Sequence, residues 1–91
     1  MGREITLFDS EERKSRAEVC TFLRALADRL ETGAVTLRKG DEELTLAVPD
    51  QLVLEIKAED EAKSGKGMQH SLEIELKWWK GIESGSGFEL G

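Results

Sequence analysis

Two side chains in this sequence, a cysteine and a histidine, are of types that could carry nucleophilic or acid–base chemistry. Cys20 could act as a nucleophile only if a base reached it, and it lies beside a helical apolar stripe, so we interpret it as a small buried residue. His70 is the single histidine, and no cysteine or second histidine is near it in the sequence. A lone histidine is a poor metal site, so we expect a structural or solvated role. The sequence therefore predicts no catalytic residue and no metal site.

Three short segments could bind ions, but each lacks part of the pattern that such binding requires. Residues 59–61 are all acidic, yet they lack the spaced oxygen ligands and the glycine of an EF-hand loop. Residues 64–67 read Ser-Gly-Lys-Gly, without an upstream glycine at P-loop spacing and without a following helix. Positive charge is concentrated near the helix start, at Arg13, Lys14 and Arg16. These side chains could form a small patch that binds an anion or a partner, but they are explained equally well as ordinary exposed residues. We therefore expect no cofactor.

The charge balance of the chain excludes several classes of partner. The chain has 91 residues, enough for one domain, with 13 basic and 19 acidic side chains and a net charge of −6. This charge opposes attraction to nucleic acid phosphates and to anionic membranes. No apolar run has the length of a signal peptide or a membrane span, and the single Cys20 cannot form an internal disulfide. We expect a cytoplasmic protein that binds neither nucleic acid nor membrane.

The residues before Gly33 have the periodicity of an amphipathic helix. Ser15 and Glu18 have the spacing of a capping box, and residues 9–12 offer an earlier start of the same kind. Gly33 stands where a left-handed residue would end the helix. The apolar residues at helical spacing are Val19, Phe22, Leu23, Leu26, Ala27 and Leu30. This pattern predicts a helix over about residues 15–32 with one apolar stripe.

After Gly33 the apolar residues alternate with a period of two, as in β-strands that bury one face. Four such runs occur, at residues 35–37, 44–48, 52–56 and 72–78. Turn signals separate them, so consecutive runs should pair antiparallel. Residues 4–8 alternate over a shorter stretch, which favours a short extra strand near the N-terminus.

Cross-strand chemistry sets the expected registers of the first three strands. With a loop at residues 39–42, the expected pairs are Arg38–Glu43, Thr36–Thr45, Leu37–Leu44 and Val35–Leu46. With a turn at residues 49–51, the next pairs are Val48–Leu52, Leu46–Leu54, Leu44–Ile56 and Glu43–Lys57. Both registers keep apolar residues on one face and place opposite charges together on the other.

The last hairpin has two registers that keep its apolar sides together, because its connection at residues 61–69 is long, polar and glycine-containing. One register places Glu55 opposite Glu75, which is a like-charge contact. The other pairs Glu55 with Lys77, Lys57 with Glu75 and Val53 with Trp79. We favour the second, since opposite-charge and aromatic pairs contribute roughly 0.2–1 kcal/mol each and opposed like charges destabilise a sheet. We expect the connection itself to be disordered or variable.

These elements fit an α+β fold in which one amphipathic helix packs on a four-stranded antiparallel meander, with the short N-terminal strand added. The other face of the sheet should see solvent. Residues 1–80 would form this single domain, and the Gly/Ser-rich residues 81–91 would form a flexible tail. Helix and sheet would share a core of Val19, Phe22, Leu23, Leu26, Leu30, Leu37, Leu46, Leu54, Ile56, Leu72, Ile74, Leu76 and Trp78.

The last alternating run ends in two adjacent tryptophans, of which the second breaks the pattern. Trp78 continues the apolar face, whereas Trp79 falls on the polar face, where so large a ring must be covered. It could be covered by Val53 with the stems of Lys57 and Lys77, by the C-terminal tail, or by a second protein. Val53, Lys77 and Trp79 therefore form the candidate interaction surface.

Several stretches together resemble the amphi-Trp domain family, which is named for an amphipathic segment followed by tryptophan. They are residues 7–13, 17–19, 26–31, 35–37 and 72–79. The resemblance covers about residues 4–80, and the last strand with its tryptophans is the most specific part. It implies a soluble, stand-alone, prokaryotic small domain. It carries over no activity, substrate or catalytic residue.

Three function classes fit these features. We expect a protein-interaction or assembly module that uses a sheet edge or the Trp79 surface, because the chain offers strand edges and an aromatic but no catalytic constellation. Its partner would be another protein or a second copy of the chain. The alternatives are an acidic inhibitor of a basic protein, and a small enzyme or regulatory domain that binds a ligand.

Overall fold

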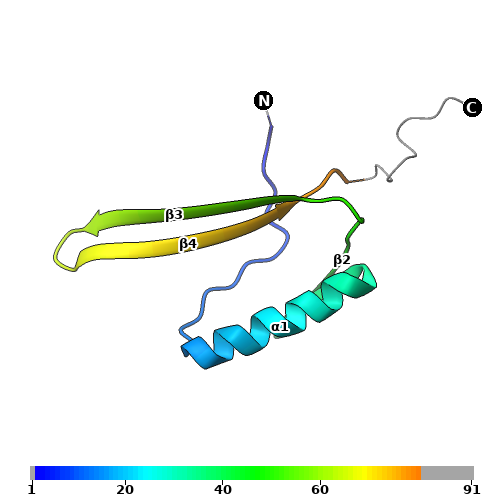
Figure 1. Cartoon of the computed structure of the whole chain (residues 1–91), viewed down its shortest axis with the longest axis horizontal. Helices are drawn as coiled ribbons and strands as arrows, with labels where there is room; N and C mark the ends of the chain where they lie inside the picture. Colours follow the sequence, from blue (N-terminus) through cyan, green and yellow to red (C-terminus); the bar gives the residue numbers. More distant parts are fainter. Residues whose placement is uncertain (1, 81–91) are drawn as a thin grey trace, which may run out of the picture. The chain divides into compact units, whose positions relative to one another are not determined.

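The computed structural model describes residues 2–80, and within this range the chain forms one helix and four strands (Figure 1). In chain order these are α1 (Arg16–Thr32), β1 (Ala34–Lys39), β2 (Glu42–Ala47), β3 (Val53–Lys63) and β4 (Gly67–Lys77). Every strand pair is antiparallel. The predicted α+β class, with a single helix and four strands, is confirmed. The predicted tail at residues 81–91 lies outside the described residues.

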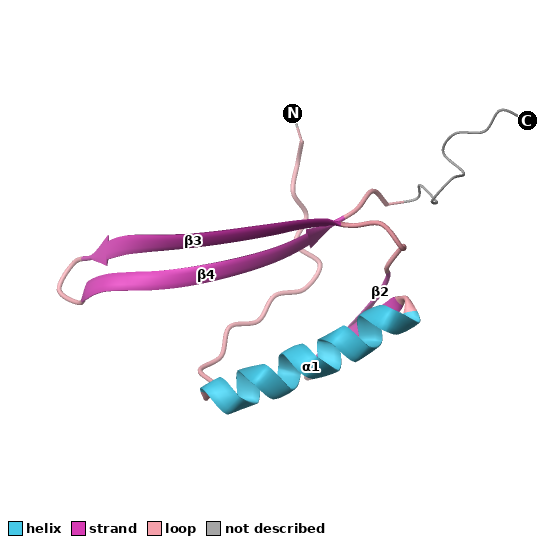
Figure 2. Ribbon diagram, in the orientation of Figure 1, coloured by secondary structure: helices cyan, strands magenta, loops and turns pink. Residues whose placement is uncertain are grey.

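The strands form two two-stranded sheets, β1–β2 and β3–β4, of which Figure 2 shows the second as a long hairpin. The chain divides after residue 48 into two compact units. The first unit holds α1, β1 and β2, and the second holds β3 and β4. The prediction of one continuous meander is wrong on this point, because neither sheet contains a β2–β3 pair. Both hairpin turns contain a glycine with positive φ, whereas residues 48–52 contain none. The side-chain pairs expected there are too weak to build a hairpin without such a turn.

The helix begins and ends where the sequence predicts. The Ser15 side chain accepts a hydrogen bond from the Glu18 amide at 3.0 Å, and the Ser15 amide donates to Glu18 Oε1 at 2.8 Å. This reciprocal capping box satisfies two amides that have no partner within the helix. Gly33 ends the helix with a φ of 87°, and its amide donates to the Leu30 carbonyl at 3.1 Å. The left-handed Gly33 turns the chain directly into β1.

The register of β1 with β2 is the predicted one, with Thr36 opposite Thr45 and Arg38 opposite Glu43. The two threonine hydroxyls lie 2.9 Å apart, and Arg38 Nε donates to Glu43 Oε2 at 2.9 Å. The ladder continues one pair further than expected and leaves a loop of Gly40 and Asp41. Two-residue loops of this kind need positive φ, and Gly40 supplies it with a φ of 60°.

The predicted register of β3 with β4 is wrong by two residues. Glu55 lies opposite Glu75, and Val53 lies opposite Lys77. The turn explains the difference, because it consists of only residues 64–66, and Gly65 and Gly67 take positive φ at its centre and its exit. This geometry outweighs the cross-strand charge pairs on which the prediction rested. The connection is also not a long disordered loop, since the strands extend to Lys63 and resume at Gly67.

The alternating residues 4–8 do not form a strand, so that prediction is wrong. Ile5 and Leu7 are exposed, and no strand of the described residues pairs with this segment. One contact ties the N-terminal region to the first sheet, where Lys39 Nζ donates to the Asp9 carbonyl at 2.8 Å. Five alternating residues without a paired neighbour gain too little to offset the loss of backbone freedom.

The extensive core that the sequence predicts is not formed within either unit. Among residues 2–80 only Val35 is buried, with 7% of its surface exposed. Leu26, Leu30 and Leu37 are half-buried in the first unit. Predicted core residues that are exposed instead are Val19, Phe22, Leu23, Leu54, Ile56, Leu72 and Ile74. A two-stranded sheet with six-residue strands has too little apolar surface to cover a 17-residue helix, and the β3–β4 unit contains no second layer.

The capping box yields a prediction for the helix. Ser15→Ala should destabilise α1 by about 1 kcal/mol, because the Glu18 amide loses its acceptor. Helix content from circular dichroism and amide exchange in the first turn would report the loss. Glu18→Gln is the matched control, since glutamine can still accept from the Ser15 amide. Equal losses in both variants would contradict this account.

The turn glycines yield a prediction for the second hairpin. Gly67→Ala should destabilise it by about 1–2 kcal/mol, because a side chain at a φ of 92° clashes with its own backbone. Amide exchange along β3 and β4 would measure the change. Gly2→Ala is the control, because no atom would lie within 4 Å of the added methyl and Gly2 is in no turn. If exchange is unchanged in Gly67→Ala, the turn does not hold the register.

Candidate functional site

The candidate site is the end of the β3–β4 hairpin that carries Val53, Lys77 and Trp79, which we call the Trp79 surface. Val53 begins β3 and Lys77 ends β4, and the two face each other in the ladder. Trp79 lies two residues beyond the end of β4. The structure therefore brings Val53 and Lys77 together, but the predicted Val53–Trp79 pair is wrong because the register shift leaves Trp79 without a cross-strand partner.

Trp79 is the most exposed large apolar residue of the described chain, with 80% of its surface accessible. Its neighbour Trp78 is half-buried, and Val53 is itself exposed. Val53 and the lysine stems, one of the three coverings that the sequence allows, therefore do not cover the indole. The tail residues that were the other intrachain candidates lie outside the described residues. A hydrated indole leaves a large amount of apolar area that gains free energy when another surface covers it.

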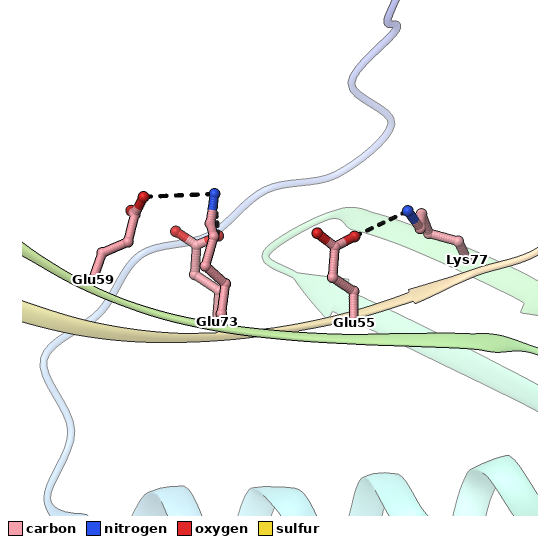
Figure 3. Close-up of polar contacts among 5 residues, drawn as sticks. Glu55, Glu59, Glu73 and Lys77 are labelled. Carbon is pink, nitrogen blue, oxygen red and sulfur yellow. Dashed lines mark hydrogen bonds and ion pairs between the residues drawn. The ribbon is translucent and has the colours of Figure 1, made fainter.

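Lys77 is held by an ion pair that crosses the ladder diagonally. Its Nζ donates to Glu55 Oε1 at 2.9 Å, as Figure 3 shows. The hydrogen bond and the charge of Lys77 lower the pKa of the Glu55 carboxyl, and the same contact raises the pKa of the Lys77 ammonium. Glu55 faces the like-charged Glu75 in the register, and the diagonal lysine offsets that repulsion.

The rest of the polar face continues this arrangement along the hairpin. Lys57 Nζ lies 3.7 Å from Glu59 Oε2 and 4.0 Å from Glu73 Oε1. Figure 3 shows Glu55, Glu59, Glu73 and Lys77 projecting from the same side of the two strands. Exposed pairs of this kind contribute little to stability because water screens them. They belong to a solvated face.

The opposite face of the hairpin is apolar but uncovered within its unit. Leu54, Ile56, Leu72 and Ile74 share this face by the alternation of the strands, and more than half of each is exposed. An exposed contiguous patch of large aliphatic side chains is typical of an interaction surface. It adjoins the Trp79 surface through Leu76 and the half-buried Trp78.

His70 has a partner that the sequence analysis missed. It lies directly opposite Asp60, and its Nδ1 contacts Asp60 Oδ1 on the apolar face. The register that we rejected would have identified this pair, because only there do residues 60 and 70 face each other. Within residues 2–80 no group of three metal-ligating side chains is assembled. The His70–Asp60 pair is therefore a two-residue polar contact on an apolar surface.

Cys20 is exposed, so its predicted burial is wrong. The cause is the same as for the helix stripe, which is only partly covered by the narrow sheet of its unit. The single histidine contacts Asp60 of the β3–β4 hairpin. The described part of the chain contains no helix that is long and apolar enough to cross a membrane.

Comparison with known proteins identifies one family. The sequence model of the Amphi-Trp domain family matches residues 1–91, which is the whole chain. No curated protein and no solved structure matches the chain. The match spans both units of the structure, including the strand that leads into the two tryptophans.

The Lys77–Glu55 pair yields a pH prediction. Because the pKa of Glu55 lies below its ordinary 4.5, its stabilising contribution is present above that pH and is lost as pH falls through the lowered pKa. Because the pKa of Lys77 lies above 10.5, its contribution is lost as pH rises through the raised value. Lys77→Met should raise the Glu55 pKa toward its ordinary 4.5, as measured by NMR titration of the side-chain carboxyl.

The matched control for this prediction is Lys66→Met in the turn, which should leave the Glu55 titration unchanged. Both variants remove one positive charge from the same hairpin, so a general charge effect would move Glu55 equally in each. A Glu55 pKa that does not respond to Lys77→Met would show that the ion pair does not form in solution.

Proposed function

The chain belongs to the Amphi-Trp domain family, and we propose that it is a protein-interaction or assembly module whose contact surface is centred on Trp79. The single observation that carries the proposal is the exposure of Trp79, of which 80% is accessible at the end of an amphipathic hairpin. Tryptophan is among the residues that contribute most to binding when a partner buries them.

The surroundings of Trp79 support an interface more than a catalytic site. Leu54, Ile56, Leu72 and Ile74 extend the apolar surface along one face of the hairpin. The charged pairs of the other face resemble the polar rim of an interface, where ion pairs contribute little affinity. In the β3–β4 sheet, each strand also has one edge that is unpaired within the described residues. A strand of a partner protein could add to either edge.

The same observations bear on partner and compartment. A protein partner or a second copy of the chain fits an apolar surface with an indole at its end. The net charge of −6 argues against nucleic acid and anionic membranes as partners. A chain with one cysteine, and therefore without an internal disulfide, suits a reducing cytoplasm. We therefore propose that the protein is cytoplasmic.

Two alternatives have less support. An acidic inhibitor would present free carboxylates to a basic protein, but Glu55 and Glu73 are near lysines of their own hairpin. Binding of a basic protein that disappears at high salt would favour this alternative. A regulatory domain would bind a small ligand, and a ligand-dependent rise in melting temperature would favour it.

The proposal predicts that Trp79→Ala leaves the fold intact but weakens self-association or partner binding, because the ring is exposed and its truncation opens no cavity. Thermal melts followed by circular dichroism test the fold, and sedimentation across a concentration series tests association. Trp78→Ala is the matched control, since it removes the same ring from a half-buried position and should lower stability.

A photo-crosslinking amino acid at position 79 locates the partner directly. We expect an adduct with a second copy or another protein from position 79, and none from position 59 on the polar face. Unfolding of Trp79→Ala would contradict the proposal. The proposal would also be contradicted if Trp79→Ala associated like the wild type and crosslinking from positions 79 and 59 were equal.

A further inference from the structure

The outer edge of β1 is a second surface that the Trp79 proposal does not use. The Val48 amide donates to the Gly33 carbonyl at 2.8 Å, which makes this a hydrogen-bonded pair of the β1–β2 ladder. Because such pairs alternate, the backbone groups of Ala34, Thr36 and Arg38 point away from β2. Among the described residues no strand pairs with this edge.

At the beginning of this edge, a side chain of the same unit already binds an outward backbone group. The Thr32 hydroxyl donates its single proton to the Arg29 carbonyl at 2.7 Å, which is closer than the Ala34 carbonyl at 3.3 Å, and it accepts from the Ala34 amide at 3.4 Å. The hydroxyl thus satisfies the outward amide of Ala34, next to the end of the helix. Thr36 and Arg38 follow along the same edge, where no described strand takes the place of this hydroxyl. A strand that added at Thr36 and Arg38 would continue the ladder.

The same edge borders a hollow of about 440 Å³. It is lined by Arg29, Thr32, Ala34, Thr36 and Arg38. The hollow therefore lies between the last turn of α1 and the unpaired side of β1, and its lining is polar and basic. An extended chain is a better occupant than a compact apolar ligand, because it can use both the backbone edge and the side chains.

Charge indicates which extended chain fits. Arg29 and Arg38 give the hollow two guanidinium groups in a protein whose net charge is −6. Arg38 is paired with Glu43 at 2.9 Å, but both side chains are mostly exposed, so another carboxylate can replace Glu43 at little cost. Guanidinium groups bind carboxylates through paired hydrogen bonds.

We propose that the outer edge of β1 binds an extended acidic segment of a partner protein, which adds to the sheet as a further strand. The backbone of Thr36 and Arg38 supplies the ladder hydrogen bonds, and the guanidinium groups of Arg29 and Arg38 receive glutamate or aspartate side chains of the partner. Main-chain pairing gives such a contact its affinity, and the two arginines give it a preference for acidic sequences.

The test uses the full chain and a capped synthetic peptide in which glutamate and valine alternate. We expect saturable binding by calorimetry, with NMR shifts concentrated at the amides of residues 34–38, and no binding of the peptide with lysine in place of glutamate. Charge reversal in the double variant Arg29→Glu with Arg38→Glu should weaken binding about tenfold or more. Added salt should weaken the wild-type complex.

A pair of proline variants separates edge pairing from simple charge attraction. Thr36→Pro removes an outward amide from the proposed edge and should abolish binding. Thr45→Pro is the matched control, because Thr45 faces Thr36 in the ladder and its own amide points to the opposite edge of the sheet, the outer edge of β2. This variant loses the same threonine contact but should still bind the peptide. Circular dichroism of both variants verifies that the helix is retained.

Three outcomes would overturn the proposal. They are no binding of the acidic peptide, equal binding by Thr36→Pro and wild type, and complete displacement of the peptide by inorganic phosphate with shifts at the arginines alone. The last result would show an anion site without strand addition. Trp79→Ala should bind the peptide normally, so this proposal and the Trp79 proposal can fail separately.

Discussion

The structure depends first on where its backbone can adopt positive φ. Within the described residues only glycines do so, at positions 33, 40, 65 and 67. Gly33 sets the last residue of the helix and the first of β1, and the others set where each hairpin turns. Because a side chain at these angles clashes with its own backbone, the turns cannot drift along the sequence. Strand partners, faces and unpaired edges all follow from these four positions.

Local features could be predicted from the sequence in detail. The capping box at Ser15 and the C-terminal Gly33 are contained within a few residues, and both formed as expected. The β1–β2 register was also correct, because turn geometry and cross-strand chemistry favour the same pairs there. In the last hairpin the two criteria disagreed. The charges favoured one register and the glycines another, and the glycines determined the result.

Features that depend on a second layer could not be predicted from periodicity. An amphipathic pattern shows which face of α1 or of the hairpin is apolar, but it does not show what covers that face. Val35 is buried as its pattern suggests, whereas Phe22 and Leu72 have the same kind of pattern and remain exposed. For the candidate site, Val53 and Lys77 meet, but Trp79 lies past the ladder. The His70–Asp60 contact and the hollow beside β1 required the actual register and the path of the chain.

The diagonal pair of Glu55 and Lys77 has a consequence for comparisons among relatives of this chain. Residues that hold each other by charge tend to change together, and such covariation is commonly interpreted as direct contact between strand neighbours. Here a coupled change at positions 55 and 77 would suggest a ladder two residues out of step, because the direct partners are 55 with 75 and 53 with 77. Coupling between positions 60 and 70, which are both direct partners and in contact, would give the true alignment.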